Sequence, residues 1–295
     1  MSIASQLTAL EGNISDAYDM VAQRGGTVPA RKNMENLDDA IATIPSGGGT
    51  FIGIPREVNA QGVYGVSQTI TSFALPGNAT KLGHYALYGA FYGSQSLTSV
   101  DMSSVTGFAV GDIKNACGHA FHGCSNLTSV DLSNLTEIRG QYAFQYAFAE
   151  CTSLTSINLS SVTSISGAYS AEAMFMGCTS LTSVNLSGLQ ALYQYLNSTF
   201  RGCVNLTTVD FSSLSDIKIS SAFLQTFNGC TSLSSLAFPS LTNNSFGSYS
   251  NQFERMLEGC SNVTLHFPSA IQTKVTTLTG YPNFGGTNTT VLFDL

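Results

Sequence analysis

The chain has 295 residues, of which 43% are hydrophobic and only 10% are charged, and its formal net charge is -7. Hydroxyl and amide side chains therefore solvate most of the surface, and the lack of any lysine or arginine cluster argues against nucleic acid and anionic membranes as partners. No apolar run approaches the roughly 18–20 residues that cross a bilayer, and the first residues lack the basic and apolar stretches of a secretory signal, so we expect no membrane insertion.

The first 47 residues are predicted to be helical and to serve attachment and oligomerisation. Apolar side chains alternate at spacings of four and three, as along the a/d seam of a coiled coil. Gly25 and Gly26 end this helix, and a second amphipathic helix follows over "NMENLDDAIATI". The predicted oligomerisation seam consists of Ile3, Leu7, Leu10, Ile14 and Val21.

Two arrangements fit this helical head. It either docks as an amphipathic hairpin on the domain that follows, or it associates with other copies of itself into a trimer or a dimer. We favour the homo-oligomer, because three heptads are marginal as an isolated helix and the glycines of "PSGGG" at 45–49 separate the head from the next domain.

The stretch "VAQRGGTVPARKNMENLDDAIATI" resembles the short N-terminal segment of virion fibre and tail proteins of tailed phages. The resemblance covers about residues 1–49 and departs from the usual pattern at Arg24, where a lysine is common. It implies a virion-attached protein whose head binds other virion proteins. Such a protein reaches the exterior through lysis, which would explain why a secretory signal is lacking.

Residues 48–62 are predicted to form a glycine-containing joint and lead-in segment, and residues 63–268 a repeat domain. "AFYGSQSLTSVDMSSV", "AFHGCSNLTSVDLSNL" and "AFAECTSLTSINLSSV" begin at Ala90, Ala120 and Ala147, and further copies follow. One anchor residue per unit recurs at spacings of 27, 30, 27, 27, 25, 27 and 30, which indicates one coil per repeat with small loop insertions. The anchors are Ile70, Leu97, Leu127, Leu154, Leu181, Leu206, Leu233 and Val263.

Each unit contains a short strand pattern. In "LTSVDL" the apolar Val130 and Leu132 alternate with polar residues, so one side of the strand is apolar. A single unit cannot bury that side alone, but stacked copies bury a continuous core and pair their strands in parallel. The sequence therefore predicts a repeat solenoid with a parallel β-sheet, preceded by the short helical head.

The repeat resembles the BspA-like, or treponemal-type, leucine-rich repeat, whose unit reads roughly L-x-x-I-x-I-P…I…A-F-x-x-C. It departs from that pattern after the strand, where five copies have serine in place of proline, as at Ser133, whereas Pro76, Pro239 and Pro268 keep it. The resemblance implies leucine-rich-repeat coils and, as a role, adhesion at a bacterial cell surface. The matching positions in one unit are Leu127, Val130, Leu132, Ile138, Ala147, Phe148 and Cys151.

Residues 269–295 break the repeat and are predicted to form a C-terminal cap. The alternation of Val291, Phe293 and Leu295 indicates a final strand, and a glycine turn at 285–286 precedes it. This cap would cover the open face that a solenoid leaves at its end.

One repeat brings together residues whose types suit zinc, namely Cys117, His119, His122 and Cys124. The sister copies argue against a metal site. The Cys124 position is cysteine in most of them and behaves as a small buried hydrophobe, whereas the His122 position varies and is expected to be exposed. We therefore expect no metal, no cofactor and free thiols, since equivalent cysteines of adjacent coils have parallel Cβ vectors, which suit a disulfide poorly.

Catalysis is not indicated either. A column of aspartate and asparagine follows the strands, but exposed strand positions must be polar and asparagine replaces aspartate midway. The chain has no G-x-S-x-G sequence and no glycine-rich phosphate loop, so we expect a protein that is not an enzyme. The column consists of Asp101, Asp131, Asn158, Asn185, Asp210 and Ala237.

Recognition is expected where the copies differ most, between each strand and the next A-F-x-G-C. These stretches are rich in tyrosine, which supplies large amphipathic contacts, and in serine and asparagine, which hydrogen-bond to protein or to sugar. Alternatively, aromatic residues such as Phe144 fill the interior of the coil. The candidate binding residues are Tyr85, Tyr88, Tyr142, Tyr146, Tyr169, Tyr193, Tyr195 and Tyr249.

Three functions fit these observations. The first is a phage fibre, tail or capsid-decoration protein on the virion, or on an extracellular surface after lysis, which displays the solenoid to a host-surface protein or glycan. The second is a BspA-like adhesin of a bacterial cell surface, and the third is a structural assembly subunit without a ligand. Loss of particle attachment when residues 1–47 are removed would favour the first, and a secretion leader upstream of Met1 the second.

Overall fold

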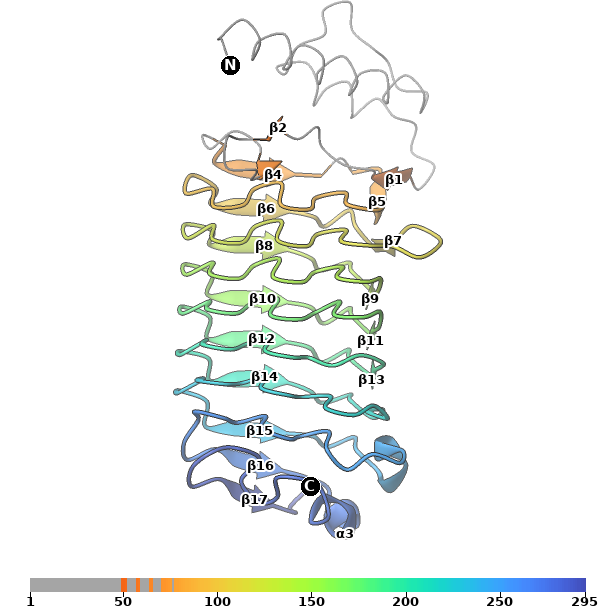
Figure 1. Ribbon diagram of the computed structural model, residues 1–295, viewed down its shortest axis with the longest axis vertical. Helices are drawn as coiled ribbons and strands as arrows, with labels where there is room; N and C mark the ends of the chain where they lie inside the picture. The colour runs from red at the N-terminus through yellow and green to blue at the C-terminus, as the bar shows by residue number, and fades with distance from the viewer. Residues whose placement is uncertain (1–48, 52–56, 59–63, 66–69, 76) are drawn as a thin grey trace, which may run out of the picture.

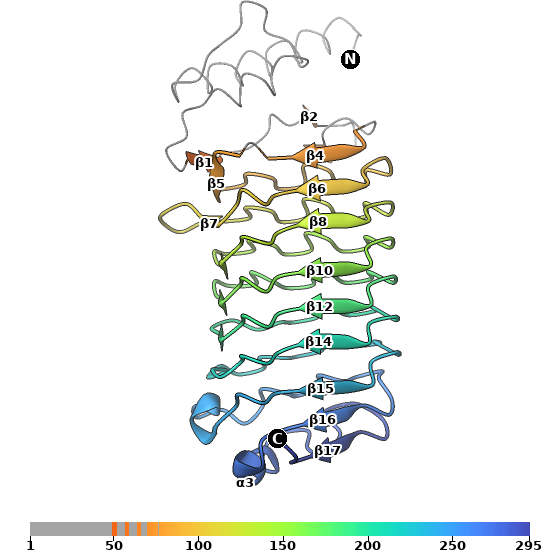
Figure 2. The same ribbon diagram turned by 180° about the vertical axis from the view of Figure 1, so that it is seen from behind.

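The structure is a solenoid whose coils stack along one axis (Figure 1, and from behind in Figure 2). The predicted helical head over residues 1–47, with its seam at Ile3, Leu7, Leu10, Ile14 and Val21, lies outside the described residues. The computed structural model describes residues 49–51, 57–58, 64–65, 70–75 and 77–295.

One strand from each coil forms the first side of the solenoid, which we call the strand wall. Its strands are β4 (Ser72–Ala74), β6 (Ser99–Asp101), β8 (Ser129–Asp131), β10 (Ser156–Asn158), β12 (Ser183–Asn185), β14 (Thr208–Asp210), β15 (Ser235–Ala237), β16 (Thr264–His266) and β17 (Thr290–Leu292). The pairing is parallel and in register, with Val100 opposite Val130. Hydrogen bonds link the strands in three groups, β4–β6–β8, β10–β12–β14 and β15–β16–β17. The predicted parallel solenoid is thus confirmed.

Shorter strands form a second side, the edge wall. They are β1 (Gly49–Phe51), β5 (Ala79–Leu82), β7 (Gly107–Phe108), β9 (Glu137–Ile138), β11 (Ser164–Ile165) and β13 (Ala191–Leu192). They pair in parallel as β1–β5–β7 and β9–β11–β13, so β1 already pairs with the first coil from within the segment predicted as a joint. The remaining elements are the hairpin strands β2 (Glu57–Val58) and β3 (Tyr64–Gly65), the 3-10 helices η2 (Asn243–Phe246) and η3 (Ser269–Ile271), and α3 (Gln272–Val275).

The third side of each coil is a run of tight turns, which we call the turn wall. Backbone φ is positive at every fourth residue, at Tyr85, Gly89 and Gly93 in one coil and at Asn115 and His119 in the next. From residue 87 to residue 94, one backbone N–H donates to a carbonyl of the next coil and the following N–H donates to the carbonyl three residues back, in strict alternation. Each N–H of this stretch therefore has a partner. Complete pairing of this kind lets an irregular backbone form a stable wall.

This backbone sends side chains inward and outward in pairs. In one coil the inward pairs are Ala86 with Leu87 and Ala90 with Phe91, and all four side chains are buried. Equivalent phenylalanines stack from coil to coil, as where the rings of Phe121 and Phe148 lie 5.2 Å apart at 5°. The predicted alternative for Phe144, a place in the interior, is confirmed, because its side chain is buried.

The cysteine column lies beside these rings. The Cys124 thiol donates to the backbone carbonyl of Phe91 in the preceding coil at 3.0 Å, and the five later copies repeat the contact. All seven cysteines of the chain are described, and all are buried free thiols, as predicted. Burial raises the pKa of Cys124 to about 12 and that of Cys260 to about 11, so the thiols stay protonated.

The C-terminal tail continues the solenoid. The predicted final strand is present as β17, which pairs in parallel with β16, and Val291 packs against the core. Phe284 is buried in the tail's own turn segment. The tail therefore lies over the last repeat by adding one more rung to the strand wall.

Candidate recognition surface

The strand wall presents a regular polar surface. From β6 to β14 its outward side chains are serine, threonine, aspartate and asparagine. Asp101 Oδ1 accepts the backbone N–H of Ser103 at 2.9 Å, and the same bond recurs at Asp131, Asn158, Asn185 and Asp210. Because either aspartate or asparagine supplies the acceptor oxygen, this column stabilises the turn that follows each strand.

The same bond explains why serine replaces proline after most strands. Proline has no N–H to donate, so it needs no acceptor two residues earlier. Where proline is present, at Pro239 and Pro268, the acceptor position is Ala237 or His266 instead. The φ of -57° at Pro268 shows that this position suits a proline ring without strain.

The turn wall carries a group of stacked rings, which we call the His–Tyr cluster: Tyr88, Tyr92, His119, His122 and Tyr146. The ring of His119 stacks on Tyr146 at 5.0 Å and 5°, and His122 lies 4.8 Å from Tyr92. Tyr88 meets His119 edge-on at 6.1 Å. Three successive coils thus contribute to one continuous aromatic surface.

The surroundings of the two histidines of this cluster disfavour their charged form. Their Nδ1 atoms are 3.3 Å apart, close enough to share one hydrogen bond. Burial lowers the pKa of both, and His122 lowers that of His119 further. Glu150, 3.7 Å from His122 Nε2, only partly offsets the effect of burial on the pKa of His122.

A second group, the tyrosine triad, consists of Tyr142, Tyr169 and Tyr195. Tyr142 stacks on Tyr169 at 5.3 Å, and Tyr195 meets Tyr169 edge-on at 5.5 Å. Beside the triad, the carboxylate of Glu172 accepts hydrogen bonds from Gln145 at 2.6 Å and Asn197 at 3.0 Å. Burial, together with Tyr169, raises the pKa of Tyr195. The triad therefore places aromatic surface next to ordered polar groups.

The other predicted tyrosines lie elsewhere on the coil surface. Tyr85 meets Tyr88 edge-on at 5.7 Å and extends the His–Tyr cluster. Tyr193, 56% exposed, directly follows β13, and the exposed Tyr249 follows η2. The structure thus brings five of the eight predicted tyrosines into the two ring groups, places Tyr85 against one of them, and leaves Tyr193 and Tyr249 apart.

Sequence reasoning missed part of the His–Tyr cluster. It expected His122 to be exposed, but stacking with Tyr92 and Tyr146 leaves only 15% of its side chain exposed. Tyr92 and His119 were not among the predicted binding residues. The usable signal was that Tyr92 occupies the outward turn position that holds His122 in the next coil, and that His119 occupies the position that holds Tyr146.

The zinc-like set does not converge. Cys117 and Cys124 point into the core, whereas His119 and His122 lie on the outer surface. Among the described residues, no group of three or more histidine, cysteine, aspartate or glutamate side chains is arranged to hold a metal ion. In the same part of the chain, no helix has the length and apolarity to cross a bilayer.

Comparison with known proteins identifies the repeat. The profile of the family described as BspA type leucine rich repeat region matches residues 60–171 and 145–275, in 6 copies. The structure is similar to that of a leucine rich cell surface protein from Faecalibacterium prausnitzii A2-165, at 22% identity over 52% of this chain, with a TM-score of 0.34; the match spans 37% of that protein. It is also similar to a leucine-rich repeat protein from Bacteroides ovatus ATCC 8483, at 18% identity over 77% of this chain and 71% of that one, with a TM-score of 0.26. No curated protein sequence matches the chain.

Proposed function

Since the chain belongs to the BspA type leucine-rich-repeat family, we propose that it is a non-enzymatic binding protein whose turn wall recognises a protein or glycan on a cell surface. One contrast carries the proposal. Aromatic rings gather on the turn wall in the His–Tyr cluster and the tyrosine triad, whereas the strand wall from β6 to β14 is uniformly polar and engaged in its own turns. A solenoid needs no exposed rings for stability, because its interior already contains a continuous aromatic stack.

Tyrosine suits recognition on physical grounds. Its ring gives large contact area at a low cost in side-chain entropy, and its hydroxyl hydrogen-bonds at the rim of a contact. The Gln145–Glu172–Asn197 network supports the triad, since it holds polar groups in fixed positions beside the rings. Ordered donors and acceptors of this kind serve a peptide or a sugar equally well. Neither use needs a metal or a cofactor.

We propose further that the protein is displayed on a virion. The head segment "VAQRGGTVPARKNMENLDDAIATI", which resembles that of tailed-phage fibre and tail proteins, supports this assignment. In this proposal residues 1–47 attach to other virion proteins and form the trimer or dimer, and the solenoid projects toward the host. The family itself favours a second candidate, an adhesin of a bacterial cell surface, and a structural subunit without a ligand is the third.

The location is tested on purified particles. Immunogold labelling and mass spectrometry of virions detect the protein if the first proposal holds, whereas surface labelling of intact bacterial cells supports the adhesin. Removal of residues 1–47 abolishes particle attachment and lowers the solution mass measured by light scattering. An unchanged mass would refute oligomerisation through the head.

Binding is tested by adsorption of the fluorescent full-length protein to intact cells. The virion proposal predicts saturable adsorption to some strains of a broad bacterial panel, and the adhesin proposal predicts adsorption to animal epithelial cells. Protease treatment of the binding cells removes a protein receptor, and periodate treatment removes a glycan. Adsorption to no cell of either panel would refute the binding function and leave the structural subunit.

A further inference from the structure

One coil contains an insertion on the edge wall. Five residues, 109–113, separate the end of β7 at Phe108 from Lys114, which bridges to Gln141 in the next coil. In that next coil only residues 139–140 separate Ile138 from Gln141. The extra residues form the loop that projects beside β7 in Figure 1, in the unit between the anchors Leu97 and Leu127, one of the two units with a spacing of 30. Insertions in solenoids commonly carry binding function.

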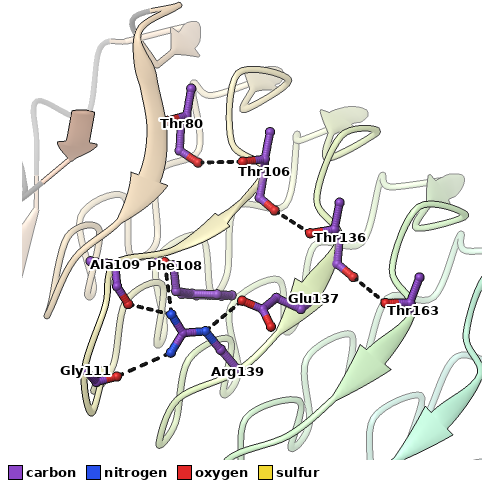
Figure 3. A network of polar contacts seen from close by, with 9 residues as sticks. All are labelled: Thr80, Thr106, Phe108, Ala109, Gly111, Thr136, Glu137, Arg139 and Thr163. Carbon is purple, nitrogen blue, oxygen red and sulfur yellow. Dashed lines mark hydrogen bonds and ion pairs between the residues drawn. The ribbon is translucent and has the colours of Figure 1, made fainter. Parts of the chain in front are cut away.

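Arginine from the following coil holds this loop (Figure 3). Arg139 Nη2 donates to the carbonyl oxygens of Phe108 at 3.1 Å and Ala109 at 2.6 Å, and Nη1 donates to Gly111 at 3.3 Å. Arg139 Nε in turn pairs with Glu137 Oε1 at 2.7 Å. The planar guanidinium thus fixes two carbonyls of the loop and the last carbonyl of β7 at once.

The base of the loop is fixed as well. The Lys114 backbone N–H donates to His84 Nδ1 at 3.2 Å, and the Lys114 carbonyl accepts the Tyr85 N–H at 3.0 Å. Before the loop, the Thr106 hydroxyl donates to the Thr80 carbonyl at 3.2 Å and thereby ties this coil to its neighbour (Figure 3). These contacts make the loop an ordered extension of the solenoid that ends beside Tyr85.

The tip of this loop exposes an aliphatic side chain to water. Val110 is 99% exposed, the largest exposed fraction among the large hydrophobic residues described. The positions equivalent to Arg139 in the next two coils are Ser166 and Tyr193, so the arginine accompanies the inserted loop. The Val110 side chain contributes nothing to the core, and the order of the loop that carries it reduces the entropy lost on binding.

We propose that residues 109–112 form a preformed recognition finger that places Val110 in an apolar pocket of a protein receptor. The proposal rests on the binding function above and names the receptor class. A valine tip gains from a pocket lined with apolar side chains, which a hydroxyl-rich glycan does not offer. A single valine beside the exposed Asp112 has too little apolar area to hold a bilayer surface.

The first test uses the adsorption assay on a strain or cell type that binds the unmodified full-length protein. Val110→Ser is expected to weaken adsorption by roughly ten- to hundredfold, the effect of losing one fully buried valine. Val204→Ser is the matched control, because Val204 is also exposed but follows Cys203 on another part of the coil. Equal adsorption by the Val110→Ser variant and the control would refute the finger while leaving the binding function intact.

A double-mutant cycle tests the role of Arg139 as a positioning residue. Arg139→Ser introduces the residue found at the equivalent position 166 and is expected to weaken adsorption, with circular dichroism unchanged. Combined with Val110→Ser, it should cause no further loss, because the arginine acts only through the placement of the valine. Additive losses would refute this role.

The receptor class is tested in parallel. Protease treatment of the target cells should abolish the difference between the unmodified protein and the Val110→Ser variant. Persistence of that difference after proteolysis, with loss after periodate, would overturn the protein receptor. If the unmodified protein binds phosphatidylcholine–phosphatidylglycerol vesicles and the Val110→Ser variant does not, the partner is a membrane and the protein receptor is overturned. If light scattering gives the Val110→Ser variant a lower molar mass than the unmodified protein, the partner is a second copy of the chain.

Discussion

Replacement of Asp101 and Ser103 tests how this chain stabilises the turn after each strand. Asp101→Ala removes the acceptor of the 2.9 Å bond from the Ser103 N–H, on an exposed surface where the bond contributes about 1 kcal/mol to the free energy of unfolding. Ser103→Pro removes the donor, but the ring restricts the unfolded chain and returns about 0.4–1 kcal/mol. We therefore expect the first variant to be destabilised and the second to be nearly neutral.

The double variant decides the matter. If aspartate acts through this bond, Asp101→Ala costs nothing once Ser103 is proline, so the double variant should match Ser103→Pro within a few tenths of a kcal/mol. Urea unfolding followed by circular dichroism measures the free energies, and Asp101→Ala alone should lower Tm by about 2–4 °C. A double variant whose loss equals the sum of the two single losses would refute the reasoning.

Three further predictions follow from the walls and the core. Hydrogen bonds from Ser103 lower the pKa of Asp101 below its ordinary 3.8, so the stability that comes from ionised Asp101 is present above that value and is lost as pH falls through the folded-state pKa. The stability gap between the wild type and Asp101→Ala should therefore be constant from pH 7 to about pH 5 and narrow in stronger acid. A gap unchanged at pH 2 would contradict this. Phe148→Ala leaves a cavity in the buried stack between Phe121 and Phe175 and should lower the free energy of unfolding by about 3–5 kcal/mol. Tyr193→Ala, on the surface, should lower it by less than about 0.5 kcal/mol. Urea unfolding measures both changes. The buried thiols, with pKa values raised by desolvation, should not react with a disulfide reagent at pH 8 until urea unfolds the chain; rapid reaction of the native protein would show that the cysteine column is open to solvent.

The repeat made much of the fold predictable. A fixed order of leucine, valine, phenylalanine and cysteine can close a coil in few ways, so the parallel strands, the buried cysteine column and the final strand at Val291 were all foreseeable. Comparison of copies also separated the inward Cys124 from the outward His122, because only the first of these positions is nearly constant.

The details of the turn wall were not predictable in the same way. The stack of His119 on Tyr146 depends on positive φ at both residues, a conformation that sequence indicates for glycine but not for histidine or tyrosine. The hydrogen bonds from Arg139 to the carbonyls of Phe108 and Ala109 were not predictable either, because they join residues of two different coils. The anchor spacing predicted an insertion there but not which residue would hold it.

The turn wall as a recognition surface is tested most directly by an adsorption isotherm on a cell type that binds the unmodified protein. The variant Tyr142→Ala/Tyr146→Ala/Tyr195→Ala removes rings from both groups, and Ser156→Ala/Ser183→Ala removes hydroxyls from the strand wall as a control. We predict that the tyrosine variant binds about a hundredfold more weakly, as expected when central aromatic contacts are lost, and that the serine variant binds like the unmodified protein. Equal affinity of the tyrosine variant and the unmodified protein, with both variants folded, would contradict the proposed recognition surface.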